Sequence, residues 1–441
     1  MKTKWIWVVV SAVVIIGMLV GGFGCKAPAP TPTATPTPTA TPTPTAYPLG
    51  KAVIKFAGQD ICSGRFGDYG RQMIMGGEMA MDEINAAGGI LGSRVELNFM
   101  DDEFNPDVAV KDTRYQFGEW GADFLIGYSM DACTVAAAAL MPEYDGILIT
   151  AHSCADMTPA YAVKERRLFV GVMGMDQDAV LPGFYFFKEQ KRTDIKSWFD
   201  LACDYDYGWN VDKIWQATMA KLNPGSEYLG AAGCPYGAVD FSAQLRTMME
   251  KKPNMVVSTP WGGDGAMIIR QAQQMGLFEQ DWFKVWWQCM GGSIDIAEGL
   301  TDDIKAGVFH DKVYGSARYL WNQSDRPENL RFVEEFRKRN AGRYPNYSAA
   351  NFYADVMCIK AAIERVGSLD KMALIKDIES HPWEGPEGPR AWRVYDHQAQ
   401  YTVPAGRYTY DANVADVAFL TDLSTTPYTE YQRQPPDLAI P

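Results

Sequence analysis

The stretch Asp68-Tyr-Gly-Arg-Gln-Met-Ile-Met-Gly-Gly-Glu-Met-Ala-Met-Asp-Glu-Ile-Asn-Ala-Ala-Gly-Gly-Ile-Leu-Gly-Ser93 decides the fold of this chain. Small and apolar residues recur in it at three- or four-residue steps, which predicts a helix with one buried face. Gly88-Gly89 supplies the stop of that helix. A strand-like run, Ala52–Ala57, precedes it, and residues 95–99 alternate between apolar and polar after it. Strand, helix and strand in this order form a βαβ unit, whose ligand-binding end is the loop after the first strand.

This stretch and its continuation resemble the type I periplasmic solute-binding proteins, specifically the leucine/isoleucine/valine-binding branch that serves ABC importers. The matching motifs are Tyr69-Gly70, Asp82-Glu-Ile-Asn85, Gly88-Gly-Ile-Leu-Gly92, and Asp101-Asp102 followed by Asn105-Pro106. The resemblance implies an α/β fold of two lobes, the type I periplasmic-binding-protein clamshell. Each lobe is expected to be a parallel sheet flanked by helices, and a hinge of several segments joins the two.

Length and charge agree with this expectation. The chain has 441 residues, which is enough for two domains that each bury a core. Its formal net charge of −13 argues against a nucleic-acid partner, because no basic stripe could offset it.

The first residues carry the signals of export. Lys2 and Lys4 precede an apolar run, so we predict a signal peptide over residues 1–24; the run could also span a bilayer as an uncleaved anchor. Cys25 follows a sequence close to a bacterial lipobox, although Phe23 stands where a small residue is usual, and we predict its lipidation. Residues 25–48 then form the lipid-anchor cysteine and a Pro/Thr linker that favours polyproline II. Either anchor places the protein at the outer face of the cytoplasmic membrane.

The opening pattern repeats in the second half of the chain. A strand over 194–204 leads through a loop into an amphipathic helix, and Tyr207-Gly208 matches the Tyr-Gly that opens the equivalent helix in the resembled family. We therefore divide the folded part into four segments. They are lobe I (first part) over 49–172, lobe II over 173–311, lobe I (second part) over 312–394, and a return to lobe II with a C-terminal extension over 395–441.

Two loops of lobe I supply the ligand-binding residues that the resemblance implies. The family sets a hydroxyl and a helix N-terminal amide against the carboxylate of its ligand, and Ser129 and Thr134 are the hydroxyl candidates here. Asp131 departs from that hydroxyl-rich loop and either faces the ligand or caps the next helix. In the second loop Ser153 is the matching hydroxyl, and His152 either contacts the ligand or bonds local backbone.

Lobe II departs from the family where an ammonium group would bind. The family carries a glutamate after the strand at 284–290, where this chain has Trp287-Gln288, and a neutral amide cannot offset a desolvated ammonium. Asp131, Asp206 and Asp264 are the possible substitutes. Tryptophans at predicted loop ends could instead form an aromatic surface against a flat or cationic ligand. They are Trp209, Trp261, Trp286 and Trp287, and at most one of the strand neighbours Trp286 and Trp287 can face the cleft. The full set of ligand-binding candidates is Tyr69, Ser129, Asp131, Thr134, His152, Ser153, Tyr207, Trp261, Trp287 and Gln288.

Cysteines and histidines give no sign of catalysis or metal binding. Seven cysteines follow Cys25, and Cys133–Cys154 and Cys203–Cys234 are possible disulfides, with free buried thiols as the alternative. The sequence contains no CxxC pair, GxSxG, HExxH, Walker A or dinucleotide fingerprint, so we predict neither an enzyme nor a cofactor or metal.

The expected function is that of an exported, lipid-anchored solute-binding protein that captures a small ligand between two lobes and delivers it to an ABC importer. The ligand is expected to be a branched-chain or other amino acid or a related small polar compound. A binder of an amide, urea or aromatic acid is one alternative, and a ligand-sensing receptor of the same fold is another. The expected partners are the small-molecule ligand, the permease subunits, and the membrane through the lipid anchor.

Overall fold

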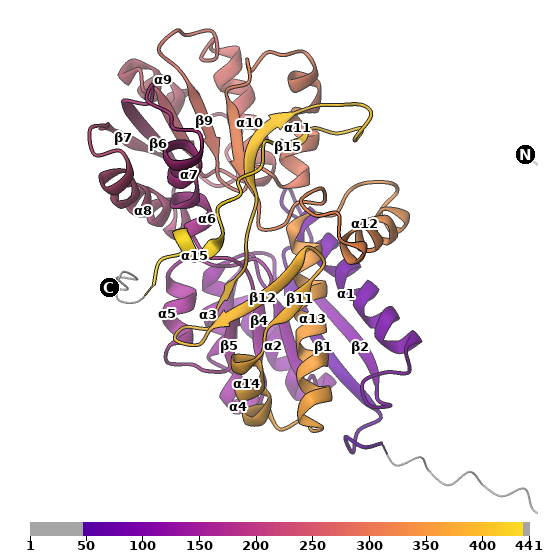
Figure 1. The fold of residues 1–441 in the computed structure, drawn as a ribbon. Helices are drawn as coiled ribbons and strands as arrows, with labels where there is room; N and C mark the ends of the chain where they lie inside the picture. The colour runs from indigo at the N-terminus through magenta and orange to yellow at the C-terminus, as the bar shows by residue number, and fades with distance from the viewer. Residues whose placement is uncertain (1–46, 435–441) are drawn as a thin grey trace, which may run out of the picture. The chain divides into compact units, whose positions relative to one another are not determined.

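A computed structural model describes residues 47–434 (Figure 1). The predicted signal peptide, the lipidation at Cys25 and the linker up to residue 46 lie outside the described residues. The described chain forms two sheets of mostly parallel strands with helices packed against them, which confirms the predicted α/β class. We call the eight-stranded sheet with its helices lobe I, and the seven-stranded sheet with its helices lobe II.

The strands of lobe I lie in the order β11-β12-β13-β5-β4-β3-β1-β2. Their bounds are β1 (Val53–Asp60), β2 (Arg94–Asp101), β3 (Phe124–Gly127), β4 (Leu148–Thr150), β5 (Leu168–Val170), β11 (Trp383–Gly385), β12 (Gly388–Arg393) and β13 (Gln398–Gln400). The helices are α1 (Asp68–Ala86), α2 (Pro106–Tyr115) with the π-helical turn η1 (Gln116–Trp120), α3 (Asp131–Ala138), α4 (Met141–Tyr144), α5 (Met157–Ala162), α13 (Tyr347–Val366) and α14 (Lys371–Ser380).

The strands of lobe II lie in the order β15-β14-β10-β9-β8-β6-β7. Their bounds are β6 (Ser197–Cys203), β7 (Glu227–Cys234), β8 (Met255–Ser258), β9 (Val285–Gln288), β10 (Val313–Ser316), β14 (Ala405–Thr409) and β15 (Phe419–Thr421). The helices are α6 (Asp176–Ala179), α7 (Leu181–Phe184) with η2 (Tyr185–Glu189), α8 (Asp206–Leu222), α9 (Ser242–Lys251), α10 (Gly262–Gln274) and α11 (Ile294–Lys305). Two more helices, α12 (Pro327–Arg339) and α15 (Tyr428–Tyr431), follow β10 and β15.

Both faces of each sheet are covered, because successive strand residues enter different cores. In β1, Phe56 packs into the core beneath α1 and α13, whereas Ala57 packs against the helices on the opposite face. In β9, Trp286 and Trp287 divide between two cores in the same way, and both are fully buried. Continuous apolar strands of this kind are typical of parallel sheets between two helical layers.

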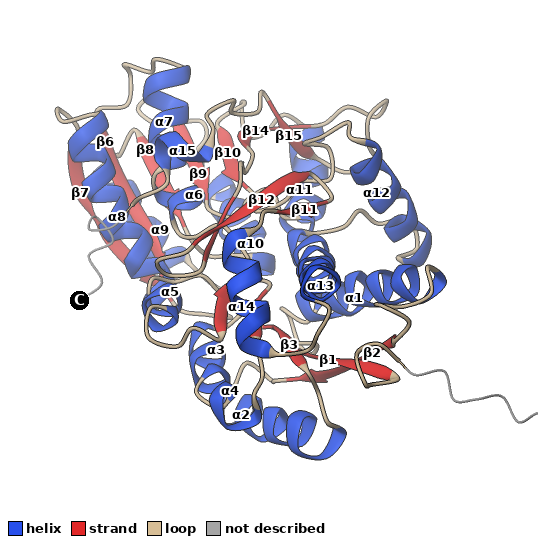
Figure 2. Cartoon of the chain, turned by 60° about the horizontal axis from the view of Figure 1, so that its bottom comes forward, coloured by secondary structure: helices blue, strands red, loops and turns tan. Residues whose placement is uncertain are grey.

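Helices α1 and α13 run side by side on one face of lobe I (Figure 2). Their close approach depends on glycine, since a Cβ at Gly76 would lie 2.2 Å from the backbone oxygen of Ala349. The stop predicted at Gly88-Gly89 is confirmed, because α1 ends at Ala86 and the Gly89 amide donates to the carbonyl of Ile84 at 2.8 Å.

The chain passes between the two sheets three times. The connecting segments are 171–196, 317–382 and 401–404, each lying between a strand of one sheet and the next strand of the other. The sheets place β10 in lobe II and β13 in lobe I, a few residues beyond our boundaries at 311/312 and 394/395. Each of these strands still pairs within the sheet that precedes the crossing, so each crossing comes a few residues later than predicted.

Of the two alternatives left open for the cysteines, the structure shows free thiols. All seven cysteines within residues 47–434 are free thiols, so neither of the two possible disulfides forms. Cys203 and Cys234 are register partners on adjacent strands, yet their thiols donate to the backbone oxygens of Thr259 and Ala232.

Candidate functional site

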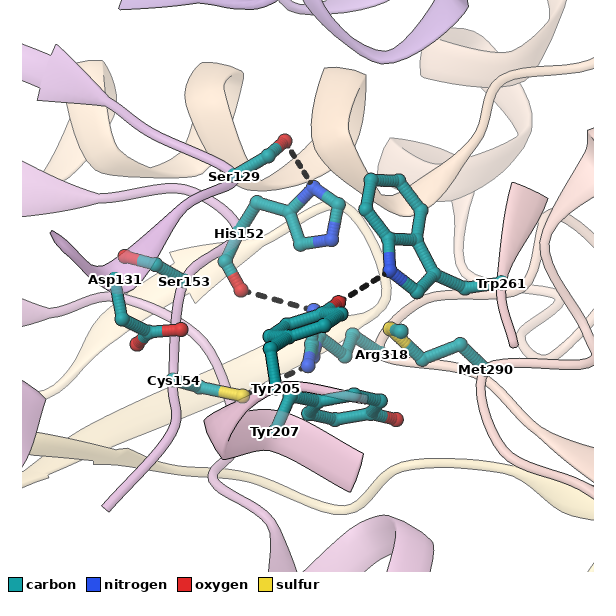
Figure 3. Close-up of a pocket in the computed structure, with 10 residues that line it drawn as sticks. All are labelled: Ser129, Asp131, His152, Ser153, Cys154, Tyr205, Tyr207, Trp261, Met290 and Arg318. Atoms are coloured by element: carbon teal, nitrogen blue, oxygen red, sulfur yellow. Dashed lines mark hydrogen bonds between the residues drawn. The ribbon is translucent and has the colours of Figure 1, made fainter. Parts of the chain in front are cut away.

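Strand ends from both sheets meet at one cavity (Figure 3). Lobe I contributes the loops after β3 and β4, and lobe II the segments after β6, β8, β9 and β10. This carboxyl-end edge is where open parallel sheets bind their ligands. The space between its lining atoms amounts to about 260 Å³, part of it open to solvent. Its lining residues are Ser129, Asp131, His152, Ser153, Cys154, Tyr205, Tyr207, Trp261, Met290 and Arg318.

His152 is held at both ring nitrogens. Its Nδ1 lies 2.6 Å from the Ser129 hydroxyl, and its Nε2 lies 2.7 Å from the Tyr347 hydroxyl. Since Ser129 donates its own proton to Asp60 at 2.8 Å, Nδ1 is the donor to Ser129 and Tyr347 donates to Nε2. Burial lowers the pKa of His152 well below its ordinary value, and the Arg318 charge lowers it further. The imidazole is therefore neutral and offers the cavity its ring rather than a free nitrogen.

Asp131 offers the cavity a carboxylate oxygen. Its side chain does not cap α3, so that alternative is wrong; Oδ1 accepts instead from the Ala155 amide at 2.8 Å and the Thr158 hydroxyl at 2.6 Å. Within residues 47–434 no hydrogen bond reaches Oδ2, which leaves it available to a ligand. Burial raises the pKa of Asp131 to about 6, against the lowering effect of those two hydrogen bonds and of Arg318.

Arg318 reaches the cavity from the segment that leaves β10. Its Nη1 donates to the backbone oxygen of His152 at 2.9 Å, and its Nη2 lies 2.7 Å from the Cys154 sulfur. Its guanidinium also lies 5.3 Å from the ring centre of Tyr347, within the range of a cation–π contact. Burial raises the pKa of Cys154 to about 12, so the sulfur is a neutral thiol and does not balance the guanidinium charge.

Aromatic side chains form the lobe II wall. The indole of Trp261 donates to the Tyr205 hydroxyl at 2.6 Å, which leaves the Tyr205 proton free to bond a ligand. The Tyr207 hydroxyl donates to Asp178 at 2.9 Å, and the same carboxylate accepts from the Met290 amide at 3.0 Å. Asp178 therefore holds the wall in place from behind.

Contacts across the cleft hold the two lobes together. Tyr69 of α1 donates to Asp295 at the start of α11, 2.9 Å away, and Arg65 forms an ion pair with Asp264 of α10. Phe66 of lobe I stacks on Tyr236 of lobe II with ring centres 4.4 Å apart. The structure is thus the closed arrangement of the lobes.

Six of the ten candidates predicted from the sequence line this cavity: Ser129, Asp131, His152, Ser153, Tyr207 and Trp261. The other four lie outside its lining. Tyr69 bonds across the cleft, and Thr134 lies behind Ser153 with the two hydroxyl oxygens 2.6 Å apart. Gln288 bonds the backbone oxygen of Ser258 at 3.2 Å, and the Trp287 indole bonds that of Asp178 at 3.0 Å. Ligand contact by any of the ten stays a prediction.

The three aspartates that could substitute for the missing glutamate lie in different environments. Asp131 lines the cavity, Asp264 is paired with Arg65, and Asp206 is exposed at the start of α8.

Four lining residues were not among the candidates: Cys154, Tyr205, Met290 and Arg318. Arg318 follows the end of β10 by two residues, and the rule that ligands bind at strand ends would have included it. The predicted boundary places residues from 312 onward in lobe I, and therefore predicts no strand end of lobe II there.

Known proteins share this architecture. The model of the periplasmic binding protein family matches residues 53–413. The chain belongs to this family. Leu/Ile/Val-binding protein homolog 1 of Brucella suis biovar 1 is 26% identical over 317 residues, which cover 70% of this chain and 78% of that protein. The predicted membership is confirmed.

Two solved structures share the two-lobed type I fold of this family member. One is the branched-chain amino acid transporter substrate binding protein of Streptococcus pneumoniae in complex with isoleucine (TM-score 0.69, 19% identity, 84% of this chain and 99% of that one). The other is a solute binding protein of an ABC transporter from Rhodopseudomonas palustris, in complex with 3,4-dihydroxy benzoic acid (TM-score 0.69, 17% identity, 84% and 96%). The clamshell fold is thereby confirmed.

The family consists of binding proteins, and that this chain is no enzyme stays a prediction. Among the residues that the structure describes, no helix has the length and apolar character needed to cross a bilayer. The same residues contain no group of three or more His, Cys, Asp or Glu placed to hold a metal ion.

Proposed function

We propose that this protein is an extracytoplasmic solute-binding protein that captures a small ligand between its lobes and delivers it to an ABC importer. The observation that carries the proposal is the small cavity between the strand ends of two closed lobes in a member of the periplasmic binding protein family. Lipidation of Cys25 and the Pro/Thr linker would hold the folded part near the membrane, where the permease lies.

The mechanism is a population shift. Lining residues come from both lobes, so a ligand makes all of its contacts only when the cleft is closed. Ligand binding therefore favours closure, and the permease would distinguish the closed form from the open one. A ligand-sensing receptor would use the same closure, with a signalling protein in place of the permease.

The relatives suggest two ligand classes. The Brucella protein is named for leucine, isoleucine and valine, and the Rhodopseudomonas protein was solved with an aromatic acid. For the present chain we propose an amino acid or an aromatic acid, because Asp131 could hold an ammonium group and Tyr205 and Trp261 could flank a ring.

A thermal-shift screen tests this proposal. The mature chain from residue 25, carrying Cys25→Ser to prevent lipidation, would be heated with amino acids, amides, urea, polyamines and aromatic acids. A ligand that binds only the native state raises Tm by mass action, so we expect at least one compound to do so. A Tm that no compound of any class raises would contradict the solute-binding function.

Ser153→Ala and Tyr69→Ala test the proposed ligand contacts. We expect each variant to bind the ligand identified in the screen roughly 3- to 10-fold more weakly while remaining folded, since one hydrogen bond contributes about 0.5–1.5 kcal/mol. Isothermal titration calorimetry gives the affinity. The control is Thr247→Ala, which removes an exposed hydroxyl on α9. Unchanged affinity in both site variants would refute this assignment.

A further inference from the structure

Arg318 is a buried cation without an acidic partner. Three arginines of the described chain are buried, and two of them form ion pairs: Arg390 with Glu387 and Arg393 with Asp396, each at 2.7 Å. Arg318 is only 1% exposed, yet among residues 47–434 no carboxylate oxygen lies within 4 Å of its guanidinium nitrogens. Its Nε has no hydrogen-bond partner at all among these residues.

The two nearby acids form no ion pair with Arg318. Asp178 lies close, but one of its oxygens accepts from Ser316 and the Met290 amide, and the other accepts from Tyr207. Asp131 lines the same cavity, and its Oδ1 is occupied by two donors of the loop that follows β4. The guanidinium thus lines the cavity with no carboxylate in direct contact, and the charge of Asp178 stabilises it only from a greater distance.

Such an arrangement is costly unless an anion completes it. A guanidinium cannot lose its proton in a protein, so burial cannot neutralise Arg318 as it neutralises His152. An unpaired buried charge is strongly destabilising, and a charge-assisted hydrogen bond to a carboxylate offsets much of that cost.

We propose that Arg318 binds the carboxylate of the ligand, and that the ligand is a small monocarboxylate. This inference rests on the proposed solute-binding function. It adds a cation to the expected hydroxyl cradle, in which Ser129 already bonds Asp60 and Thr134 bonds Ser153. A doubly charged anion such as phosphate is disfavoured, because it would bring two negative charges against one guanidinium and the carboxylate of Asp131.

The carboxylate is common to both ligand classes. An α-amino acid would place its ammonium at Oδ2 of Asp131, and an aromatic acid would place its ring against Tyr205 and Trp261. A comparison of amino acids with aromatic acids would show which class binds, and the proposed role of Arg318 is the same for both.

Acid–amide pairs test the inference on the unchanged protein. Leucine with leucinamide, phenylalanine with phenylalaninamide, and benzoate with benzamide differ only in the carboxylate. We expect at least one acid to bind, and its amide to bind at least 100-fold more weakly by calorimetry, because the amide leaves the guanidinium unpaired. An amide or an amine that binds as tightly as its acid overturns the inference and leaves the solute-binding function standing. Binding by no compound of either kind overturns both.

Arg318→Met tests the residue itself, using the acid that binds in the first experiment. We expect at least a 100-fold loss of affinity and, without ligand, a Tm equal to or above that of the parent, because an unpaired buried charge has been removed. Arg318→Lys keeps the charge without the planar fork and should lose less affinity than Arg318→Met. The matched control is Arg407→Gln, which removes an arginine of lobe II that pairs with Asp311 and Asp422.

Two results would overturn the assignment. One is acid binding by folded Arg318→Met within 3-fold of the parent. The other is an unliganded Tm of Arg318→Met far below that of the parent together with full acid affinity in Arg318→Lys, which would indicate a structural arginine. If Arg318→Met does not fold, the acid–amide comparison decides the question by itself.

Discussion

At the scale of single residues, the hydrogen-bond partners of a side chain indicate its role in the site better than its residue type does. Ser129, Thr134 and His152 have the chemistry of ligand contacts, yet each makes its hydrogen bonds to other protein groups. Asp131 and Arg318 are the residues that bring charge to the cavity. Which polar groups remain free depends on contacts between distant loops, so the sequence could name the loops but could not choose among their hydroxyls.

Asp131→Asn should flatten the pH dependence of ligand binding. The raised pKa, about 6, means that Asp131 is mostly ionised at pH 7.5 and mostly protonated at pH 5. A ligand with an ammonium group should therefore bind more tightly as the pH rises, and an acid without one more tightly as it falls, by up to roughly 10-fold. Arg318, the other charged residue of the cavity lining, does not titrate, and burial keeps the pKa of His152 well below its ordinary value.

Calorimetry between pH 5 and pH 7.5 measures this effect. The control is Asp206→Asn, which changes an exposed aspartate at the start of α8. A pH profile that is as steep in Asp131→Asn as in the parent would contradict the assignment.

At the scale of elements, local pattern was sufficient where one face of an element is buried. The helix between Tyr69 and the Gly88-Gly89 stop, the strands around it and the amphipathic α8 follow from periodicity. Helix α2 ends at Tyr115 and continues to Trp120 as a π-helical turn, for which the sequence has no recognisable pattern. The short strands β11 to β15 pair largely with their sequence neighbours in antiparallel fashion, and only β13 with β5 and β14 with β10 join them to the two parallel sheets.

Gly76→Ala should destabilise lobe I. The added Cβ would lie 2.2 Å from the backbone oxygen of Ala349 in α13, and backbone atoms cannot move aside cheaply. Overpacking of this kind costs about 1–3 kcal/mol, and each kcal/mol corresponds to ~2–4 °C in Tm for a domain of this size class. The expected fall is therefore several degrees by calorimetry. Gly118→Ala is the control, because its nearest atom, Tyr144 Cε1, would lie 3.7 Å away. A Gly76→Ala protein as stable as the control would contradict the described packing of α1 on α13.

At the scale of the whole molecule, the resemblance supplied what periodicity could not, namely that two sheets face one cleft. Both halves show strand–helix alternation, but alternation alone does not say where the chain crosses between them. The contacts that close the cleft join residues far apart in sequence, such as Tyr69 with Asp295. They have no local signature, so the sequence did not show that Tyr69 donates to Asp295 across the cleft.

Arg65→Ala should shift the molecule toward the open form. Arg65 pairs with Asp264 and donates to the backbone oxygen of Ala238 at 3.0 Å, and both partners belong to lobe II. Loss of these contacts makes the closed form less stable relative to the open form. Ligand binding must then supply more of the free energy of closing. We expect roughly a 10-fold loss of affinity, about 1.4 kcal/mol, and a larger radius of gyration without ligand. Small-angle scattering with and without ligand measures the shift.

Arg192→Ala is the control, because it breaks an ion pair with Asp194 that lies wholly within the connecting segment 171–196. Since Arg65 is partly exposed, the difference from the control should shrink in high salt. If Arg65→Ala scatters and binds as the control does, the pair with Asp264 does not govern closure, and the energy of closing must come from the ligand and the aromatic contacts instead.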